Sequence, residues 1–234
     1  MDWRSPPSGV SEIRRSLVHR PRRFEAGRPI QRTQPFPRLM IADIIPFIIE
    51  CEKLKSVQRR TKVVGTDRRE NSAEHSWSLT LLAMGLFPQM EVPLDQLRVL
   101  KMLLIHDIVE IDAGDTFCYT ARADKAECEQ LAADRLFALL PVDLAKEFMA
   151  LWHEFEAGET PEATFANSLD RMLPLIQNLN NNGQSWREHG ITYEQVIERN
   201  GVIRRSSPVL WEQVEAMLLD AAGKGILPKA VPQS

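Results

Sequence analysis

The chain has 234 residues, 44% of them apolar, which suits one domain with a buried core and a tail. Its formal net charge is only −3, so no strong basic footprint for nucleic acid appears at the level of the whole chain. Its three cysteines lack Cys-x-x-Cys spacing, which favours reduced thiols. No apolar run approaches the length of about 20 residues that spans a bilayer. We expect a cytoplasmic protein with neither nucleic acid nor membrane as a partner.

Residues 1–38 are rich in Arg and Pro and show little apolar periodicity. Such a segment cannot bury enough apolar surface to offset its ordering entropy. We therefore predict a disordered N-terminal extension over 1–38, a folded domain over 40–223 and a flexible C-terminal tail over 224–234. The helical pattern begins at Met40, which we take as the expected native start. A transit peptide or a phosphate-binding arm are the alternatives for the Arg-rich segment.

Helical periodicity dominates the first half of the domain. It predicts a helix over 44–55, a basic loop over 57–69, a helix that begins at Asn71 or Ser72 and ends near 87, a helix over 94–110 and a loop over 112–124. Asn71 and Ser72 are both suited to capping a helix. Residues 94–110 are apolar almost all round, and a helix of that kind is normally buried, so we place it at the centre of the fold.

The second half predicts five further helices, over residues 125–139, 142–156, 161–179, 193–200 and 208–223. Thr160 is an N-cap, and Pro161 follows it at the preferred first helical position. Pro174 should kink that helix. Thr192 and Gln195 form a capping box at the start of the next one. No convincing strand pattern appears, so the predicted fold class is all-α.

A short run in the middle of the chain, residues 104–115, places an imidazole and several carboxylates in an apolar setting. Such groups are costly to bury unless they are paired or bind a metal. On a helix, Glu110 lies one turn from both His106 and Asp107. His75 and Asp170 stand in similar settings elsewhere. The mixed nitrogen and oxygen donors suit one divalent transition metal, which is Mn, Co, Fe, Ni or Zn, with Mg as a further candidate.

This ordered set of motifs resembles the HD-domain metal-dependent phosphohydrolases, and most closely the bacterial 5'-deoxynucleotidases and their eukaryotic HD-domain-containing relatives. The resemblance covers about 41–203. It rests on Glu-Asn-Ser-x-Glu-His at 70–75, His-Asp-x-x-Glu at 106–110, Gly-Asp at 114–115 and Leu-Asp at 169–170. It implies an HD-domain helical bundle whose central apolar helix binds metal, with one ion held by His75, His106, Asp107 and Asp170. Only His153 lies between Asp107 and Asp170, which disfavours a two-metal site.

The same resemblance implies roles for further side chains. Glu110 is expected beside the attacking water, where a carboxylate orients it or takes its proton; a solvated helix-end carboxylate is the alternative. Asp115 would protonate the leaving nucleoside oxygen or hold the sugar, although Gly-Asp is also ordinary turn chemistry. Thr116 beside it is a substrate-binding candidate. Arg59 would bind the substrate phosphate, with Arg60 beside it where the bacterial enzymes have Trp, which puts the sugar selectivity in doubt.

Three functions remain open at this point. We expect a metal-dependent phosphomonoesterase that hydrolyses (deoxy)nucleoside 5'-monophosphates to nucleoside and phosphate. The basic stretch that contains Arg59, Arg60 and Lys62 motivates an alternative, a nucleoside triphosphate or guanosine polyphosphate hydrolase. A non-catalytic, metal-binding helical interaction protein is the third, and the intact Glu110 and Asp115 argue against it. Members of the resembling group are often dimers, which implies a homodimer here.

Overall fold

The protein is represented by a computed structural model that describes residues 41–115 and 124–230. The predicted extension over 1–38, Thr116 and Cys118 lie outside the described residues. The first part contains η1 Ile41–Asp43, α1 Ile45–Cys51, η2 Glu52–Ser56, β1 Gln58–Lys62, β2 Arg69–Asn71, α2 Ser72–Leu86, η3 Phe87–Gln89, α3 Gln96–Ile105, η4 His106–Val109 and α4 Glu110–Ala113. The second part contains α5 Lys125–Phe137, α6 Val142–Ala157, α7 Pro161–Asn180, α8 Gln184–His189, α9 Tyr193–Arg199, α10 Gly201–Ser206 and α11 Pro208–Gly223.

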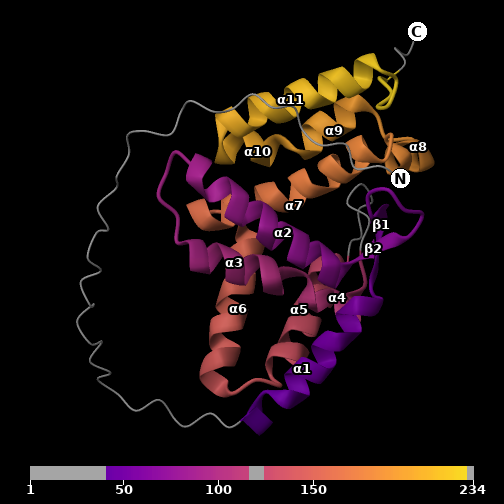
Figure 1. Cartoon of the computed structure of the whole chain (residues 1–234). Helices are drawn as coiled ribbons and strands as arrows, with labels where there is room; N and C mark the ends of the chain where they lie inside the picture. The colour runs from indigo at the N-terminus through magenta and orange to yellow at the C-terminus, as the bar shows by residue number, and fades with distance from the viewer. Residues whose placement is uncertain (1–40, 116–123, 231–234) are drawn as a thin grey trace, which may run out of the picture. The chain divides into compact units, whose positions relative to one another are not determined.

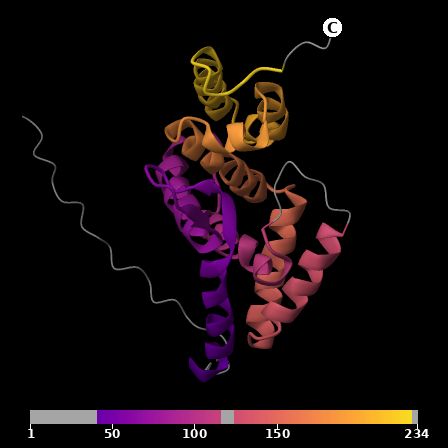
Figure 2. The same cartoon turned by 90° about the vertical axis from the view of Figure 1, so that its right-hand side faces the viewer.

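The domain is mostly helical, and helix α7 runs through its middle (Figure 1). It contacts α2, α3, α6 and α10. The C-terminal helices α8–α11 gather at one end, and α1, α5 and α6 lie at the other, an arrangement that both views show (Figures 1 and 2). The predicted all-α class is therefore confirmed, with one small hairpin as an addition.

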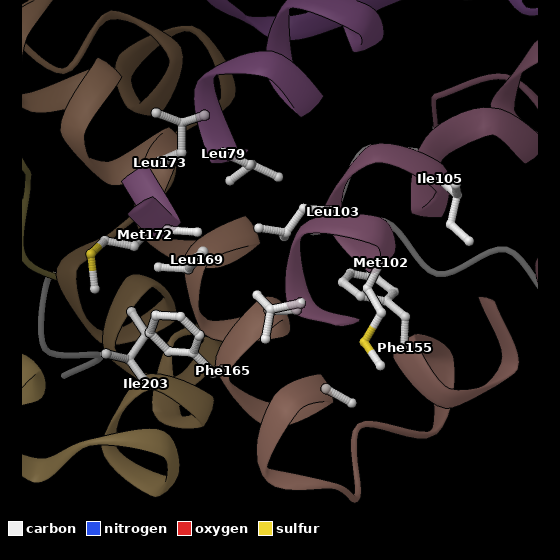
Figure 3. Close-up of a cluster of buried hydrophobic side chains, with 14 of the residues drawn as sticks. Leu79, Met102, Leu103, Ile105, Phe155, Phe165, Leu169, Met172, Leu173 and Ile203 are labelled. Carbon is white, nitrogen blue, oxygen red and sulfur yellow. The ribbon is translucent and has the colours of Figure 1, made fainter. Parts of the chain in front are cut away.

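The apolar core lies where the helices meet α7. Figure 3 shows Leu79 from α2, Leu103 from α3, Phe165 and Leu169 from α7 and Ile203 from α10 gathered around a shared interior. All five side chains have an exposed fraction of 0%. Burying a large apolar side chain stabilises the folded state by roughly 1.5–3 kcal/mol. This packing fixes α2, α3 and α7 relative to one another, and these are the elements that lead into the candidate site.

The predicted helix starts are confirmed at their caps. The backbone N–H of Glu74 donates to Asn71 Oδ1 at 2.9 Å, and the Glu74 side chain accepts from the Asn71 backbone at 3.1 Å. Thr160 Oγ1 accepts from the Ala163 backbone at 3.1 Å. Helix α7 then continues through Pro174. Because the Asn71 cap sets where α2 begins, it also sets the direction in which the first turn of α2 presents its side chains.

The prediction of one continuous helix over 94–110 was wrong. Helix α3 ends at Ile105, and His106–Val109 form the 3-10 turn η4 before α4 begins. Leu97 and Leu104 are 64% and 50% exposed, so α3 has an apolar face that is open to solvent. Apolar periodicity does not distinguish a single 3-10 turn from the α-helix that leads into it, because both keep residues three to four apart on one side.

The predicted loop over 57–69 contains a hairpin instead. Strands β1 and β2 pair antiparallel, with Gln58 opposite Asn71 and Lys62 opposite Arg69. The strand was missed because β1 is polar and basic and lacks the β-branched and aromatic residues that favour strands. Alternate side chains of a strand point to opposite faces, and accordingly Arg59 is half-buried whereas Arg60 is exposed.

The chain beyond α11 packs onto the C-terminal helices. Leu227 is fully buried, and the Tyr193 backbone N–H donates to Pro228 O at 2.8 Å. Gly183, with φ +66°, lies so close to this segment that a Cβ there would be 2.3 Å from Ile226 O. The described part of the predicted tail is therefore held by the domain, while the domain boundaries stay a prediction. Among the residues described, no helix is long and apolar enough to cross a membrane.

Candidate active site

The structure brings together the four side chains that were singled out as metal-ligand candidates. His75 lies in the first turn of α2, His106 and Asp107 lie in η4, and Asp170 lies in the middle of α7. One ligand atom from each of His75, His106 and Asp107 falls within 4.8 Å of the others. Asp170 Oδ1 is 3.0 Å from His75 Nε2 and 3.8 Å from His106 Nε2. All four side chains are buried, so this is a compact polar cluster inside an apolar domain.

The two imidazole rings are held in defined orientations. His106 Nδ1 donates to the Leu103 carbonyl at 3.0 Å, since a carbonyl oxygen only accepts. The other ring nitrogen, Nε2, is buried 3.1 Å from Asp107 Oδ1 and 3.8 Å from Asp170 Oδ1. Burial alone would lower the pKa of His106, but these carboxylates outweigh it and raise that pKa to about 10, so Nε2 carries a proton when no metal is bound. A divalent cation would take the place of that proton, and the hydrogen bond from Nδ1 is the support that metal-binding histidines usually have.

Glu70 supports His75 from the other side, a role that the sequence analysis did not assign. It belongs to β2, is 2% exposed, and its Oε2 lies 3.4 Å from His75 Nδ1. Gln177 Nε2 donates to Glu70 Oε1 at 2.6 Å. Thr61 Oγ1 lies 3.4 Å from Glu70 Oε2. Glu70 belongs to the same sequence motif as His75. Its role became apparent only from the β1–β2 hairpin, which places its carboxylate beside the His75 imidazole.

Arg59 enters the same cluster from β1. Its Nη1 donates to Asp107 Oδ2 at 2.8 Å, and its Nη2 lies 4.0 Å from Asp170 Oδ1. The side chain is only 14% exposed. Burial alone would lower the pKa of Arg59, but the charges of Asp107 and Asp170 outweigh it and raise that pKa above its ordinary value. Arg59 is therefore a fixed, buried cation at the predicted site.

Glu110 and Asp115 have carboxyl groups in an environment that favours their protonated forms. Glu110 is 8% exposed, so the alternative of a solvated helix-end carboxylate is wrong. Ser72 Oγ donates to Glu110 Oε2 at 2.6 Å. Burial and the charge of Asp107 raise the pKa of Glu110 to about 9. Burial also raises the pKa of Asp115, against the opposing charge of Arg59.

The neighbouring Asp107 behaves in the opposite way. Burial would raise its pKa, but His106 and Arg59 outweigh that effect and hold the pKa of Asp107 at about 2. Carboxyl groups whose pKa values are driven apart within one site are suited to separate roles, one as a permanent anion and the others in proton transfer.

Six of the side chains described above line one cavity of about 630 Å³, within the usual range for small-molecule sites: Arg59, His106, Asp107, Glu110, Asp115 and Asp170. Arg60 lines it too, together with residues that the sequence analysis did not single out, among them Lys125, Arg171, Trp186 and Arg199. Arg171 directly follows Asp170, a predicted metal ligand. No sequence pattern pointed to Lys125, Trp186 or Arg199. The cavity thus extends well past the polar cluster, along α7 and toward α8 and α9.

Gly114 determines how Asp115 enters the site. It follows α4 with φ 74° and ψ 155°, a conformation that side-chain-bearing residues rarely adopt. We expect Gly114→Ala to lower the free energy of unfolding by about 1–3 kcal/mol, measured by denaturant unfolding. Gly85→Ala is the matched control, since that glycine has ordinary helical geometry and no atom within 4 Å of a new Cβ. Equal stability of both variants would contradict the argument.

The raised pKa of Glu110 also makes a prediction about stability in the absence of metal. Its ordinary pKa is 4.5 and its folded-state pKa is about 9. Such a group contributes stability that is complete below the lower pKa and is lost as the pH rises through the higher one. In the presence of a chelator, Glu110→Gln should therefore raise the Tm relative to the unaltered protein at pH 8, and by much less at pH 5. An equal effect at both pH values would show that Glu110 is not buried as a neutral acid.

Comparison with known protein families and solved structures gives consistent matches. Residues 51–211 match the family described as HD domain. The 5'-deoxynucleotidase HDDC2 of Mus musculus is 28% identical over 139 residues, which cover 58% of this chain and 68% of that protein. The 5'-deoxynucleotidase hdd1 of Schizosaccharomyces pombe is 26% identical over 142 residues, covering 57% of this chain and 70% of that one.

Two solved structures extend the comparison. A predicted metal-dependent phosphohydrolase from Magnetospirillum magnetotacticum MS-1 is 44% identical with a TM-score of 0.77, and the match covers 82% of this chain and 98% of that one. The PH0347 protein from Pyrococcus horikoshii OT3 is 19% identical with a TM-score of 0.54, over 74% and 99% of the two chains. The second likeness concerns the fold alone.

Proposed function

This chain belongs to the HD-domain phosphohydrolases, and we propose that it is a metal-dependent phosphomonoesterase that hydrolyses nucleoside 5'-monophosphates, with 2'-deoxy forms preferred. The observation that carries the proposal is the convergence of a His/Asp cluster, a buried arginine and two carboxyl groups of raised pKa on one cavity. The relatives named 5'-deoxynucleotidases support the substrate class, although they are distant.

We assign His75, His106, Asp107 and Asp170 as the ligands of one divalent transition metal ion, either Mn, Co, Fe, Ni or Zn, with Mg as a further candidate. The buried Nε2 of His106, which faces Asp107 and Asp170, and the mixed donor set fit such an ion. A divalent ion there would polarise the phosphate, activate a water and lower the pKa of nearby carboxyl groups.

The remaining roles follow from the side chains of the chain itself. Arg59 binds the phosphate, because a guanidinium matches its oxygens and this one is already fixed in the cavity. Glu110 would accept the proton of the water that attacks phosphorus once a bound cation has lowered its pKa and left it ionised. Asp115, whose pKa is raised, gives a proton to the nucleoside O5' as the P–O5' bond breaks. Thr116 stays a candidate for contact with the substrate.

A hydrolase of nucleoside triphosphates or guanosine polyphosphates is the second candidate. The observation that favours it is the presence of Arg60, beside Arg59, on the wall of the same cavity. A non-catalytic metal-binding protein fits poorly with membership of a phosphohydrolase family and with the intact Glu110 and Asp115.

A phosphate-release screen tests the proposal. Ribo- and deoxynucleoside monophosphates, diphosphates and triphosphates would each be incubated with Mn²⁺, Co²⁺, Mg²⁺ or Zn²⁺, and the products identified. We expect nucleoside and inorganic phosphate from monophosphates. Release of pyrophosphate from triphosphates, without turnover of monophosphates, would favour the second candidate. No turnover of any substrate with any metal would favour the non-catalytic one.

The contrast between Arg59 and Arg60 gives a sharper test of the phosphate site. Arg59→Ala should raise KM and lower kcat for a deoxynucleoside monophosphate, because the guanidinium contacts phosphate in both the ground and transition states. Arg60→Ala should have the smaller effect, since Arg60 is exposed at the cavity wall, whereas Arg59 is fixed against Asp107 within the cluster. A severe Arg60→Ala together with a silent Arg59→Ala would mean that the neighbouring arginine binds the phosphate.

The cytoplasmic location and the homodimer both stay predictions. Helix α2 offers an apolar surface for a homodimer, because three large side chains on its outer face are exposed to solvent: Trp77 at 63%, Leu81 at 48% and Met84 at 57%.

A further inference from the structure

Two arginines beyond the catalytic cluster line the same cavity and take no part in the reaction described above. Arg171 follows Asp170 on α7, and its Nη1 lies 3.3 Å from Asp170 Oδ2, with the side chain 28% exposed. Arg199 is the last residue of α9 and is exposed. In the part of the chain that the structure describes, Arg199 has no carboxylate partner.

We propose that Arg171 and Arg199 form a second anion subsite, which binds a second phosphate group of the nucleotide substrate. The proposal rests on the proposed function, because it takes the scissile phosphate to be bound at Arg59 and the His/Asp cluster. It extends the substrate class from nucleoside 5'-monophosphates to nucleotides that carry a second phosphate group, either at the 3' position or in a 5'-diphosphate chain.

The charges around Arg171 support this assignment. Its one carboxylate partner among the described residues is Asp170, whose other oxygen faces His75 at 3.0 Å. Asp170 is also the assigned metal ligand on α7, so its negative charge is shared between the cluster and Arg171. The guanidinium therefore retains capacity for another anion, and its planar fork matches phosphate oxygens.

The extent of the cavity supports it as well. In the proposed function one phosphate would bind around Arg59, whereas the cavity wall also includes Arg171 on α7 and Arg199 at the end of α9. A neutral group seated over these two arginines would remove water from their charges without replacing it, which costs free energy. An anionic group there compensates the loss, and a base or sugar alone does not.

Binding measurements separate this subsite from catalysis. Isothermal titration would be carried out with Mn²⁺-loaded full-length protein carrying Glu110→Gln to slow turnover. The ligands would be a deoxynucleoside 5'-monophosphate, its 3',5'-bisphosphate and its 5'-diphosphate, all with the same base. We expect one of the two-phosphate ligands to bind at least tenfold more tightly than the monophosphate, and the identity of that ligand locates the second phosphate.

Arg171→Gln and Arg199→Gln should each lower this affinity ratio by about tenfold or more, since hydrogen bonds between charged groups contribute about 1.5–3 kcal/mol. Arg171→Lys should restore part of the ratio, which separates charge from packing. Arg205→Gln is the matched control, because Arg205 is an exposed arginine on the nearby α10 that does not line the cavity. It should leave the ratio unchanged.

An unchanged ratio in both Arg171→Gln and Arg199→Gln would overturn the subsite. If the variants lose affinity equally for all three ligands, the ratio is likewise unchanged, and the two arginines belong to a base-binding wall instead. The outcome is distinguishable from failure of the proposed function. If the arginine-dependent ratio holds but unaltered protein releases no phosphate, the function fails and the subsite stands. If phosphate is released and the ratio is insensitive to both arginines, the subsite alone fails.

Discussion

We expect His106→Ala and Asp107→Ala each to yield protein that binds no stoichiometric metal and releases no phosphate. The two residues are adjacent in η4, are both buried, and approach His75 to within 4.8 Å. Loss of one donor from a four-ligand site lowers metal affinity sharply, and it leaves the remaining buried carboxylate charge without compensation. Elemental analysis after metal loading and dialysis measures occupancy, and phosphate release measures activity.

His153→Ala is the matched control for that experiment. His153 is the one other histidine between Asp107 and Asp170, it is exposed on α6, and its Nε2 lies 2.9 Å from Gln130 Oε1, away from the cluster. It should keep both metal and activity. Full metal occupancy in both His106→Ala and Asp107→Ala would overturn the ligand assignment, whatever the activity.

We expect Glu110→Ala to keep its metal but to lose turnover by about 10²–10⁴-fold, the usual contribution of a general acid or base. Glu110 lies in the same cavity as the cluster, and Ser72 holds its carboxyl group at 2.6 Å, so removal takes away a positioned proton acceptor and not a ligand. Steady-state kcat under metal saturation, with metal content measured in parallel, is the test.

Asp112→Ala controls for the loss of a carboxylate on the same short helix. Asp112 is exposed, pairs with Arg135 and does not line the cavity. Its variant should turn over at close to the normal rate. If Glu110→Ala did the same, the proton would have to be accepted by another group, and Asp115 would be the first to examine.

Much of the fold follows from local patterns in the chain. Helical periodicity and caps such as Asn71 and Thr160 predicted most helices, because these signals act within one turn. The hairpin was missed because its strands are polar and gain their stability from contacts with α7 and α2 instead of from intrinsic propensity. The short helices α8 and α10 were missed for a related reason, since so few residues give no clear period.

The four ligand candidates could be named from the sequence, but their supporting residues could not. The structure brings His75, His106, Asp107 and Asp170 together, and the matches to the HD domain confirm the family resemblance, while the ligand roles stay a prediction. Glu70 was not assigned a role because its hydrogen bond from Gln177 joins two residues that are 107 positions apart in the sequence. Contacts between residues so far apart in the chain depend on how the helices pack against one another. That packing cannot be read from the sequence alone.

His75 and Asp170 are 95 positions apart in the sequence, so their contact links the local unfolding of distant segments of the chain. The cluster joins the start of α2, the turn η4 and the middle of α7, so fraying of any one of them separates the donor atoms. Ion binding should therefore merge three local fluctuations into one larger opening event. Amide hydrogen exchange would show this directly: adding metal should slow exchange in all three elements by the same factor, while α11, which contributes no ligand, keeps its own rate.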